Sequence, residues 1–79
     1  MKKTVVIVGG SGKIGSFITN YLSKKNEFEI LIIDKFKSKF NNFDTFIKFD
    51  LLNFNKYKKL KSKILKKYKS IDILINCAA

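Results

Sequence analysis

The chain has 79 residues, a net charge of +11, one cysteine and no histidine. A chain of this length, about half a typical domain, has a marginal core. The cross-links that stabilise small domains are not expected, since the single Cys77 cannot form an internal disulfide and no histidine is present to bind zinc. We therefore predict no metal site and a reducing, cytoplasmic location. The longest aliphatic run, residues 30–33, is far shorter than the ~20 residues that span a bilayer, so we expect no membrane association.

The charge invites a nucleic-acid interpretation, but the residue types argue against it. All 17 basic residues are lysine, whereas readers of phosphates and bases usually use the bidentate fork of arginine. Abundant Phe, Ile, Asn and Tyr without Arg or Pro are typical of an AT-rich genome. We expect a solvated lysine surface and no specific nucleic-acid partner. A basic fragment that binds nucleic acid non-specifically stays an alternative.

The hydrophobic pattern predicts an alternation of strands and helices. Strands are expected at residues 4–8, 28–33, 45–49 and 71–75, and helices at 13–25 and 53–69, with Asn26 closing the first and Asn53 capping the second. Each helix is expected to turn an apolar stripe toward a sheet. The stripes are Ile14, Phe17, Ile18, Tyr21 and Leu22 in the first helix, and Phe54, Tyr57, Leu60, Ile64, Leu65 and Tyr68 in the second.

The connections determine the expected topology. Residues 35–43, with Phe36, Phe40 and Phe43 at helical spacing, are expected to form at most a turn or two of helix. Connections too long for hairpins imply right-handed crossovers and a parallel sheet. The prediction is an α/β fold, the N-terminal half of a doubly wound, Rossmann-like sheet with strand order 3-2-1-4. Residues 1–79 would form one partial dinucleotide-binding domain.

A glycine-rich turn between the first strand and the first helix is the strongest functional signal. The predicted phosphate-binding residues are Gly9, Gly10, Ser11, Gly12, Lys13, Ile14 and Gly15. Gly9 would permit the tight turn, Gly12 the approach of a pyrophosphate, and Gly15 close packing of the helix. The N–H groups and positive dipole end of the helix would hold the anion. Glycines that serve only a tight turn are the alternative.

Asp34 ends the second strand, where a carboxylate accepts hydrogen bonds from the adenosine ribose. It would also repel a 2′-phosphate, so NAD is favoured over NADP as the cofactor, although Lys35 would partly offset that repulsion. The alternative is that Asp34 is an ordinary turn residue.

The spacing Gly-x-x-Gly-x-x-Gly resembles that of the short-chain dehydrogenase/reductase family, particularly its extended branch, which usually has threonine at the position of Val8. Two further segments strengthen the resemblance: Asp50-Leu51, and the run from Asp72 to Ala79, similar to Asp-x-Leu-Val-Asn-Asn-Ala-Gly. The resemblance implies that Asp50 and Leu51 meet the adenine. It also implies that Asn76 and Ala78 lie beside the adenosine, with Cys77 as a small filler. Asp50 as a plain turn residue is the alternative.

The resemblance further implies an NAD(P)-dependent oxidoreductase that acts on a hydroxyl or carbonyl group of a small-molecule substrate. A nucleotide-sugar enzyme of the extended type and a non-catalytic NAD(P) sensor are alternatives. The family's Tyr-x-x-x-Lys pair follows a fifth strand, whereas the matches here, Tyr21 to Lys25 and Tyr57 to Lys61, lie on earlier helices. We therefore predict no catalytic residue, a truncated and inactive chain, and oligomerisation only in a full-length protein.

Overall fold

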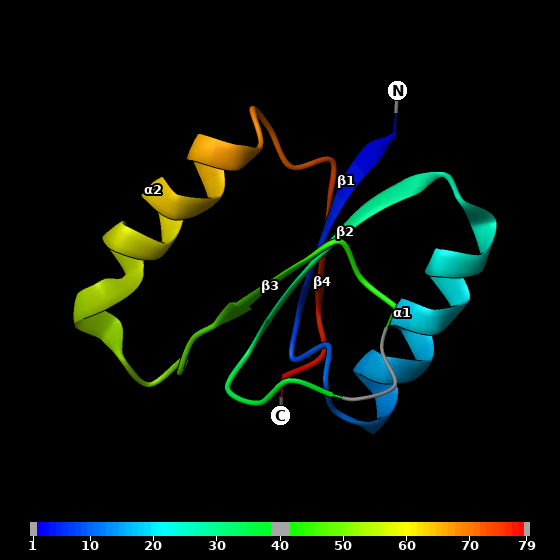
Figure 1. The fold of residues 1–79 in the computed structure, drawn as a ribbon. Coiled ribbons are helices and arrows are strands. Elements are labelled where there is room, and N and C mark those ends of the chain that lie inside the picture. Colours follow the sequence, from blue (N-terminus) through cyan, green and yellow to red (C-terminus); the bar gives the residue numbers. More distant parts are fainter. Residues whose placement is uncertain (1, 39–41, 79) are drawn as a thin grey trace.

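The computed structural model describes residues 2–38 and 42–78. Its elements, in chain order, are β1 (Lys3–Val8), α1 (Lys13–Lys25), β2 (Phe28–Asp34), β3 (Thr45–Lys48), the 3₁₀ turn η1 (Phe54–Lys56), α2 (Tyr57–Lys67) and β4 (Ile73–Asn76). The strands are parallel and lie in the order β3-β2-β1-β4, which confirms the predicted topology. Helix α1 covers one face of this sheet and α2 the other (Figure 1).

Two aspartates hold the amino ends of the strands in register. The Asp72 carboxylate accepts the Thr4 N–H at 2.7 Å, and the Asp72 N–H donates to the Thr4 carbonyl at 3.0 Å. Asp44 makes the same pair of bonds with Ile30, at 2.7 and 2.9 Å. A charged acceptor makes a stronger bond to a strand-end N–H than a neutral one does. Asp72, part of the fourth-strand motif, therefore aligns β4 beside β1.

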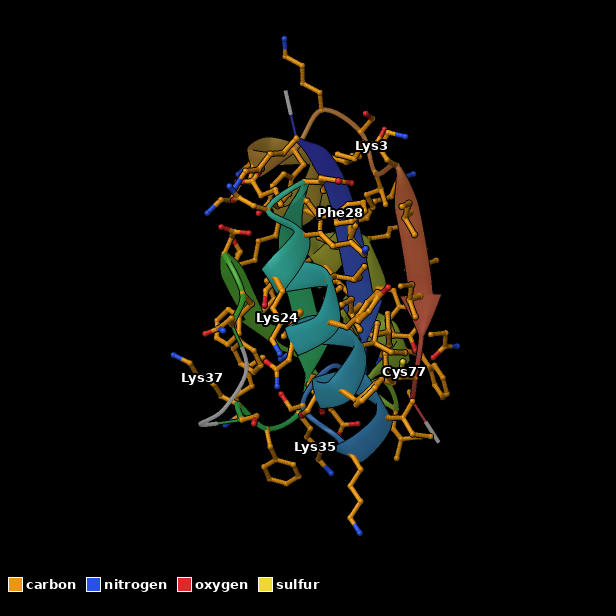
Figure 2. All side chains as sticks on the ribbon, turned by 90° about the vertical axis from the view of Figure 1, so that its right-hand side faces the viewer. Lys3, Lys24, Phe28, Lys35, Lys37 and Cys77 are labelled. Carbon is orange, nitrogen blue, oxygen red and sulfur yellow. The ribbon has the colours of Figure 1, made fainter. Side chains whose placement is uncertain are left out.

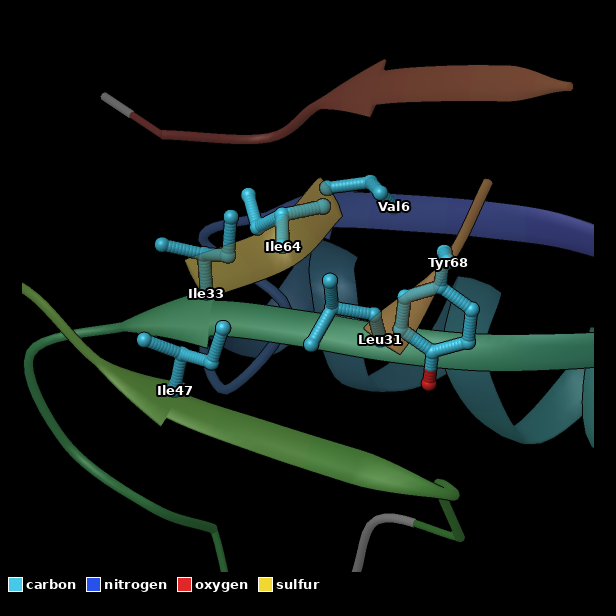
Figure 3. Close-up of a cluster of buried hydrophobic side chains, with 6 residues drawn as sticks. All are labelled: Val6, Leu31, Ile33, Ile47, Ile64 and Tyr68. Atoms are coloured by element: carbon cyan, nitrogen blue, oxygen red, sulfur yellow. The ribbon is translucent and has the colours of Figure 1, made fainter. Parts of the chain in front are cut away.

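The core on the α2 face joins sheet and helix. Figure 3 shows its buried residues, which are Val6, Leu31, Ile33, Ile47, Ile64 and Tyr68. The phenol of Tyr68 lies 2.8 Å from the Thr45 hydroxyl, so its polar end has a partner. Burial raises the pKa of the Tyr68 phenol, and the hydrogen bond with Thr45 opposes that rise.

The predicted inward stripe of α1 is only partly right. Ile18 and Leu22 pack on the cluster of Val5, Ile7, Ile30 and Ile32, as expected. Ile14, Phe17 and Tyr21 are instead 70%, 73% and 56% exposed. The innermost residues of α1 are Gly15 and Thr19, whose hydroxyl bonds to the Gly15 carbonyl at 2.7 Å. Small residues let the helix lie close to the sheet, so its contact line is centred on them.

The second helix differs from the prediction at both ends. It is entered through η1, where Asn53 makes no side-chain capping bond, and it ends at Lys67 rather than near residue 69. Ile64 and Tyr68 are buried and Leu60 packs against them, but Phe54, Tyr57 and Leu65 are exposed. The lysines of α2 are all exposed, as predicted.

Other boundaries shift by one or two residues. Asp34 is the last residue of β2, while β3 ends before Phe49 and β4 begins at Ile73. Asn26 closes α1 in the left-handed conformation (φ 53°), as predicted. Residues 35–38 and 42–44 contain no helix, and Phe40 lies outside the described residues. Neither helix in the described ranges is long and apolar enough to cross a membrane.

Two leucines of the same sheet, one on β2 and one on the edge strand β4, test this burial pattern. Leu31 is fully buried, whereas Leu74 is 66% exposed. We expect Leu31→Ala to lower the free energy of unfolding by about 2–5 kcal/mol, because it leaves a cavity. Leu74→Ala should cost less than about 1 kcal/mol. Urea denaturation followed by circular dichroism measures both, and equal losses would contradict the assigned core.

Candidate functional site

A hollow of about 570 Å³ lies at the carboxyl ends of the strands. It is lined by Gly9, Gly12, Lys13, Ile14, Gly15, Ile33, Asp34, Lys35, Phe49, Asp50, Leu51, Leu52, Cys77 and Ala78. In Figure 2, Lys35 and Cys77 lie at this end of the molecule, while Lys3 and Phe28 lie at the other. Ligands of open α/β sheets bind at the carboxyl ends of the strands, so this is the expected place for a site.

Gly9 and Gly15 are glycines because the fold requires them. Gly9 has φ +76°, and a Cβ there would lie 2.7 Å from the Ala78 nitrogen. A Cβ on Gly15 would collide with the Gly9 carbonyl oxygen and lie 2.7 Å from the Gly10 Cα. The turn, the start of α1 and the end of β4 are thus in contact with no room for a side chain between them.

Gly12 differs, because none of the described residues requires it to be glycine. Its φ of −75° and ψ of −179° suit any residue. A Cβ would meet the Gly9 carbonyl oxygen at 3.6 Å, an ordinary contact. Gly12 is exposed and faces the hollow. The missing side chain of Gly12 therefore makes room only for a ligand that enters the hollow from solvent.

The start of α1 is suited to an anion. Helical N–H groups of the first turn have no acceptor within their own helix, and here they belong to Lys13, Ile14 and Gly15, which line the hollow. This first turn, which is fully described, contains no acidic residue, and Gly12 makes no side-chain cap. The positive end of the helix dipole is therefore not neutralised by the helix itself.

Asp34 binds the glycine-rich turn directly. Its Oδ2 accepts the Ser11 N–H at 2.9 Å, and its Oδ1 accepts the Lys35 N–H at 2.6 Å. The Ser11 hydroxyl in turn accepts the N–H of Ser38 at 3.3 Å. A carboxylate has about four acceptor positions, so Asp34 retains capacity for further donors. It is therefore both a brace for the turn and a lining residue of the hollow.

Asp50 makes a turn and an ion pair. Its Oδ1 accepts the Leu52 N–H at 3.0 Å, and its Oδ2 lies 3.6 Å from the Lys35 Nζ. Leu51 and Leu52 follow along the rim, where the Tyr57 hydroxyl donates to the Leu51 carbonyl. Asp50 is therefore a turn residue that also lines the hollow, and its expected contact with the adenine stays a prediction.

The residues at the end of β4 differ in whether they line the hollow. The exposed Asn76 uses its Oδ1 to accept the Ala78 N–H at 3.1 Å, and it does not line the hollow. Cys77 and Ala78 do line it, and the Cys77 N–H donates to the Val8 carbonyl at 2.7 Å. Asn76 therefore shapes the strand end.

The structure brings together most of the predicted site residues. Gly10, Ser11 and Asn76 are the three predicted residues that do not line the hollow. Five residues line it that were not predicted as binding residues: Ile33, Lys35, Phe49, Leu52 and Cys77. A signal for these was present in the sequence, since each lies within two residues of a predicted site residue at a strand end.

Tyr21 and Tyr57, expected to pack on the sheet, are exposed, and the Lys25 Nζ lies 4.9 Å from the centroid of the Tyr21 ring.

The contrast between Gly12 and Gly15 gives a stability prediction. Gly15→Ala should lower the free energy of unfolding by about 1–3 kcal/mol or more, because the new Cβ overlaps backbone atoms. Gly12→Ala should leave it unchanged or raise it by up to about 1 kcal/mol, since alanine restricts the unfolded chain. Thermal and urea unfolding of the two variants measure this. A large loss for Gly12→Ala would show that the protein itself needs this glycine.

Comparison with known proteins agrees with this geometry. The family model described as the saccharopine dehydrogenase NADP binding domain matches residues 5–79, which include the glycine-rich turn and every strand end at the hollow. A search of curated proteins found no match. The match supports an NAD(P)-binding dehydrogenase family, but neither the short-chain family in particular nor a preference for NAD. The chain belongs to the family of saccharopine dehydrogenase NADP-binding domains.

Proposed function

We propose that the hollow binds the adenosine diphosphate half of NAD(P), as part of an oxidoreductase that transfers hydride between the nicotinamide and a small-molecule substrate. The observation that carries this proposal is Gly12, an exposed glycine that lines the hollow where the protein has room for a Cβ. Pyrophosphate approach to the backbone at a helix start accounts for such a glycine.

Each part of the adenosine diphosphate half would have a counterpart in the hollow. The pyrophosphate would accept hydrogen bonds from the first-turn N–H groups of α1. The ribose hydroxyls would donate to the remaining acceptor positions of Asp34. The adenine would lie between the end of β3, at Asp50 and Leu51, and the end of β4, at Ala78. The bound cofactor supplies the hydride chemistry, and these residues bind and orient it.

NAD is the proposed cofactor, in spite of the NADP in the family's name. Asp34 places a carboxylate at the end of β2, where a 2′-phosphate would be repelled. The nearest compensating charge in the hollow, Lys35, is paired with Asp50.

The proposed reaction is oxidation or reduction at a hydroxyl or carbonyl carbon, in line with the resemblance of the motifs to short-chain dehydrogenases. The family name supports a second candidate, a substrate of the saccharopine type. Oxidation of NADH by a longer protein that contains this domain and a catalytic region, in the presence of each substrate class, would distinguish them.

Replacement of Gly12 tests cofactor binding. Gly12→Ala, and more strongly Gly12→Val, should weaken NADH binding by at least about tenfold, because the side chain occupies the place of the pyrophosphate. Fluorescence titration of NADH measures the affinity, with unfolding curves to show that the variants are folded. Equal affinity in wild type and both variants would overturn the assignment of the turn.

Asp34→Ala tests the ribose contact. Loss of a hydrogen bond to a charged group costs about 1.5–3 kcal/mol, so NADH should bind roughly 10- to 100-fold more weakly. The variant also loses the bond to Ser11, but that affects both cofactors alike. The ratio of NADH to NADPH affinity therefore reports on the 2′ position. The ratio should shift toward NADPH, and an unchanged ratio would reduce Asp34 to its bracing role.

A further inference from the structure

In the part of the chain that the structure describes, three charged side chains line the hollow at the adjacent ends of β2 and β3. Asp34 is hydrogen-bonded to the glycine-rich turn, and its neighbour Lys35 extends to Asp50. The Lys35 Nζ and the Asp50 Oδ2 are 3.6 Å apart, and the two side chains are 56% and 40% exposed. The pair therefore joins two strand ends across the rim of the hollow.

The lysines around the hollow are not equivalent. Among the described residues two lysines line it: Lys13 begins α1, at the proposed pyrophosphate position, and Lys35 follows β2, at the proposed ribose position. Lys37, on the same loop as Lys35, has its Nζ 5.5 Å from the centroid of the Phe43 ring. Lys35 is therefore the cation placed to meet a group on the ribose 2′ oxygen.

We propose that Asp50 is a specificity-determining residue that disfavours NADP by holding Lys35 away from the 2′-phosphate. The inference rests on the proposed binding of NAD(P) in the hollow. The 2′-phosphate of NADP must compete with the Asp50 carboxylate for the charge of Lys35, whereas NAD requires no contact with Lys35. Asp50 acts here as a positioning residue, through Lys35 and not through contact with the phosphate.

The exposure of the pair determines the size of the effect. Exposed ion pairs are weak, so the 2′-phosphate can compete with Asp50 for Lys35 at a small cost in free energy. The resulting preference for NAD over NADP is therefore modest, about two- to fivefold. Salt screens such pairs, so the effect should decrease in 1 M salt. A simpler role for Asp50 would be plain repulsion of the phosphate, and that role does not need Lys35.

A double-mutant cycle separates these two roles. Asp50→Asn removes the charge but keeps an Oδ1 that can accept the Leu52 N–H, so the turn is preserved. Lys35→Met removes the cation while keeping a long side chain. Lys37→Met is the matched control on the same loop, and Glu27→Gln removes a negative charge just before β2, at the opposite end of the sheet. The measurement is the ratio of NADPH to NADH dissociation constants, from fluorescence titration of each variant.

We expect Asp50→Asn to shift this ratio toward NADPH by about fivefold in the wild-type background, and by no more than about twofold in the Lys35→Met background. The two control variants should leave the ratio as it is. An equal shift in both backgrounds would show plain repulsion and overturn the proposal, as would no shift at all. Wild type that binds neither cofactor would overturn the proposed function itself. If wild type binds NADH but the effects of Asp50→Asn and Lys35→Met on the ratio are independent of each other, only the proposed role of Asp50 is overturned.

Discussion

The rest of the structure depends on the close contact within the turn from Gly9 to Gly15. Three elements meet there without intervening side chains: the end of β1, the start of α1 and the end of β4. The left-handed Gly9 directs the chain back over the sheet, and the missing Cβ of Gly15 lets α1 begin against it. The same contact gathers the strand ends around one hollow. Both the packing of the sheet and the shape of the site therefore depend on a few backbone atoms.

That contact also explains why α1 presents an unexpected face to the sheet. With its first turn held at the glycines, the line of closest approach runs through Gly15 and Thr19. The larger apolar residues Ile14, Phe17 and Tyr21 then point away from the core. Hydrophobic periodicity identifies the apolar side of a helix, but the height and rotation of the helix above the sheet depend on its smallest residues.

The charges at the hollow form one connected set. Asp34 bonds to the turn, Lys35 follows Asp34, and Asp50 pairs with Lys35 while shaping its own turn. A ligand that changes one of these interactions affects its neighbours, because the same carboxylates serve the backbone and the site. Under the proposed function, the cofactor preference of the hollow would depend on the pairing of these charges as well as on their number.

The sequence by itself determined the four strands, both helices and the order of the strands in the sheet. These features depend on the local hydrophobic period and on the length of the connections. It also identified the glycine-rich turn, Asp34 and Asp50, since strand-end residues follow directly from the strand assignments. Only the tertiary structure decided the distinction between Gly12 and Gly15, the exposure of Tyr21 and Tyr57, and the pairing of Lys35 with Asp50. The physical reason is that each of these depends on the distance between segments far apart in the chain. A residue pattern records which side chains are available, and the packing of the strand ends decides which of them meet.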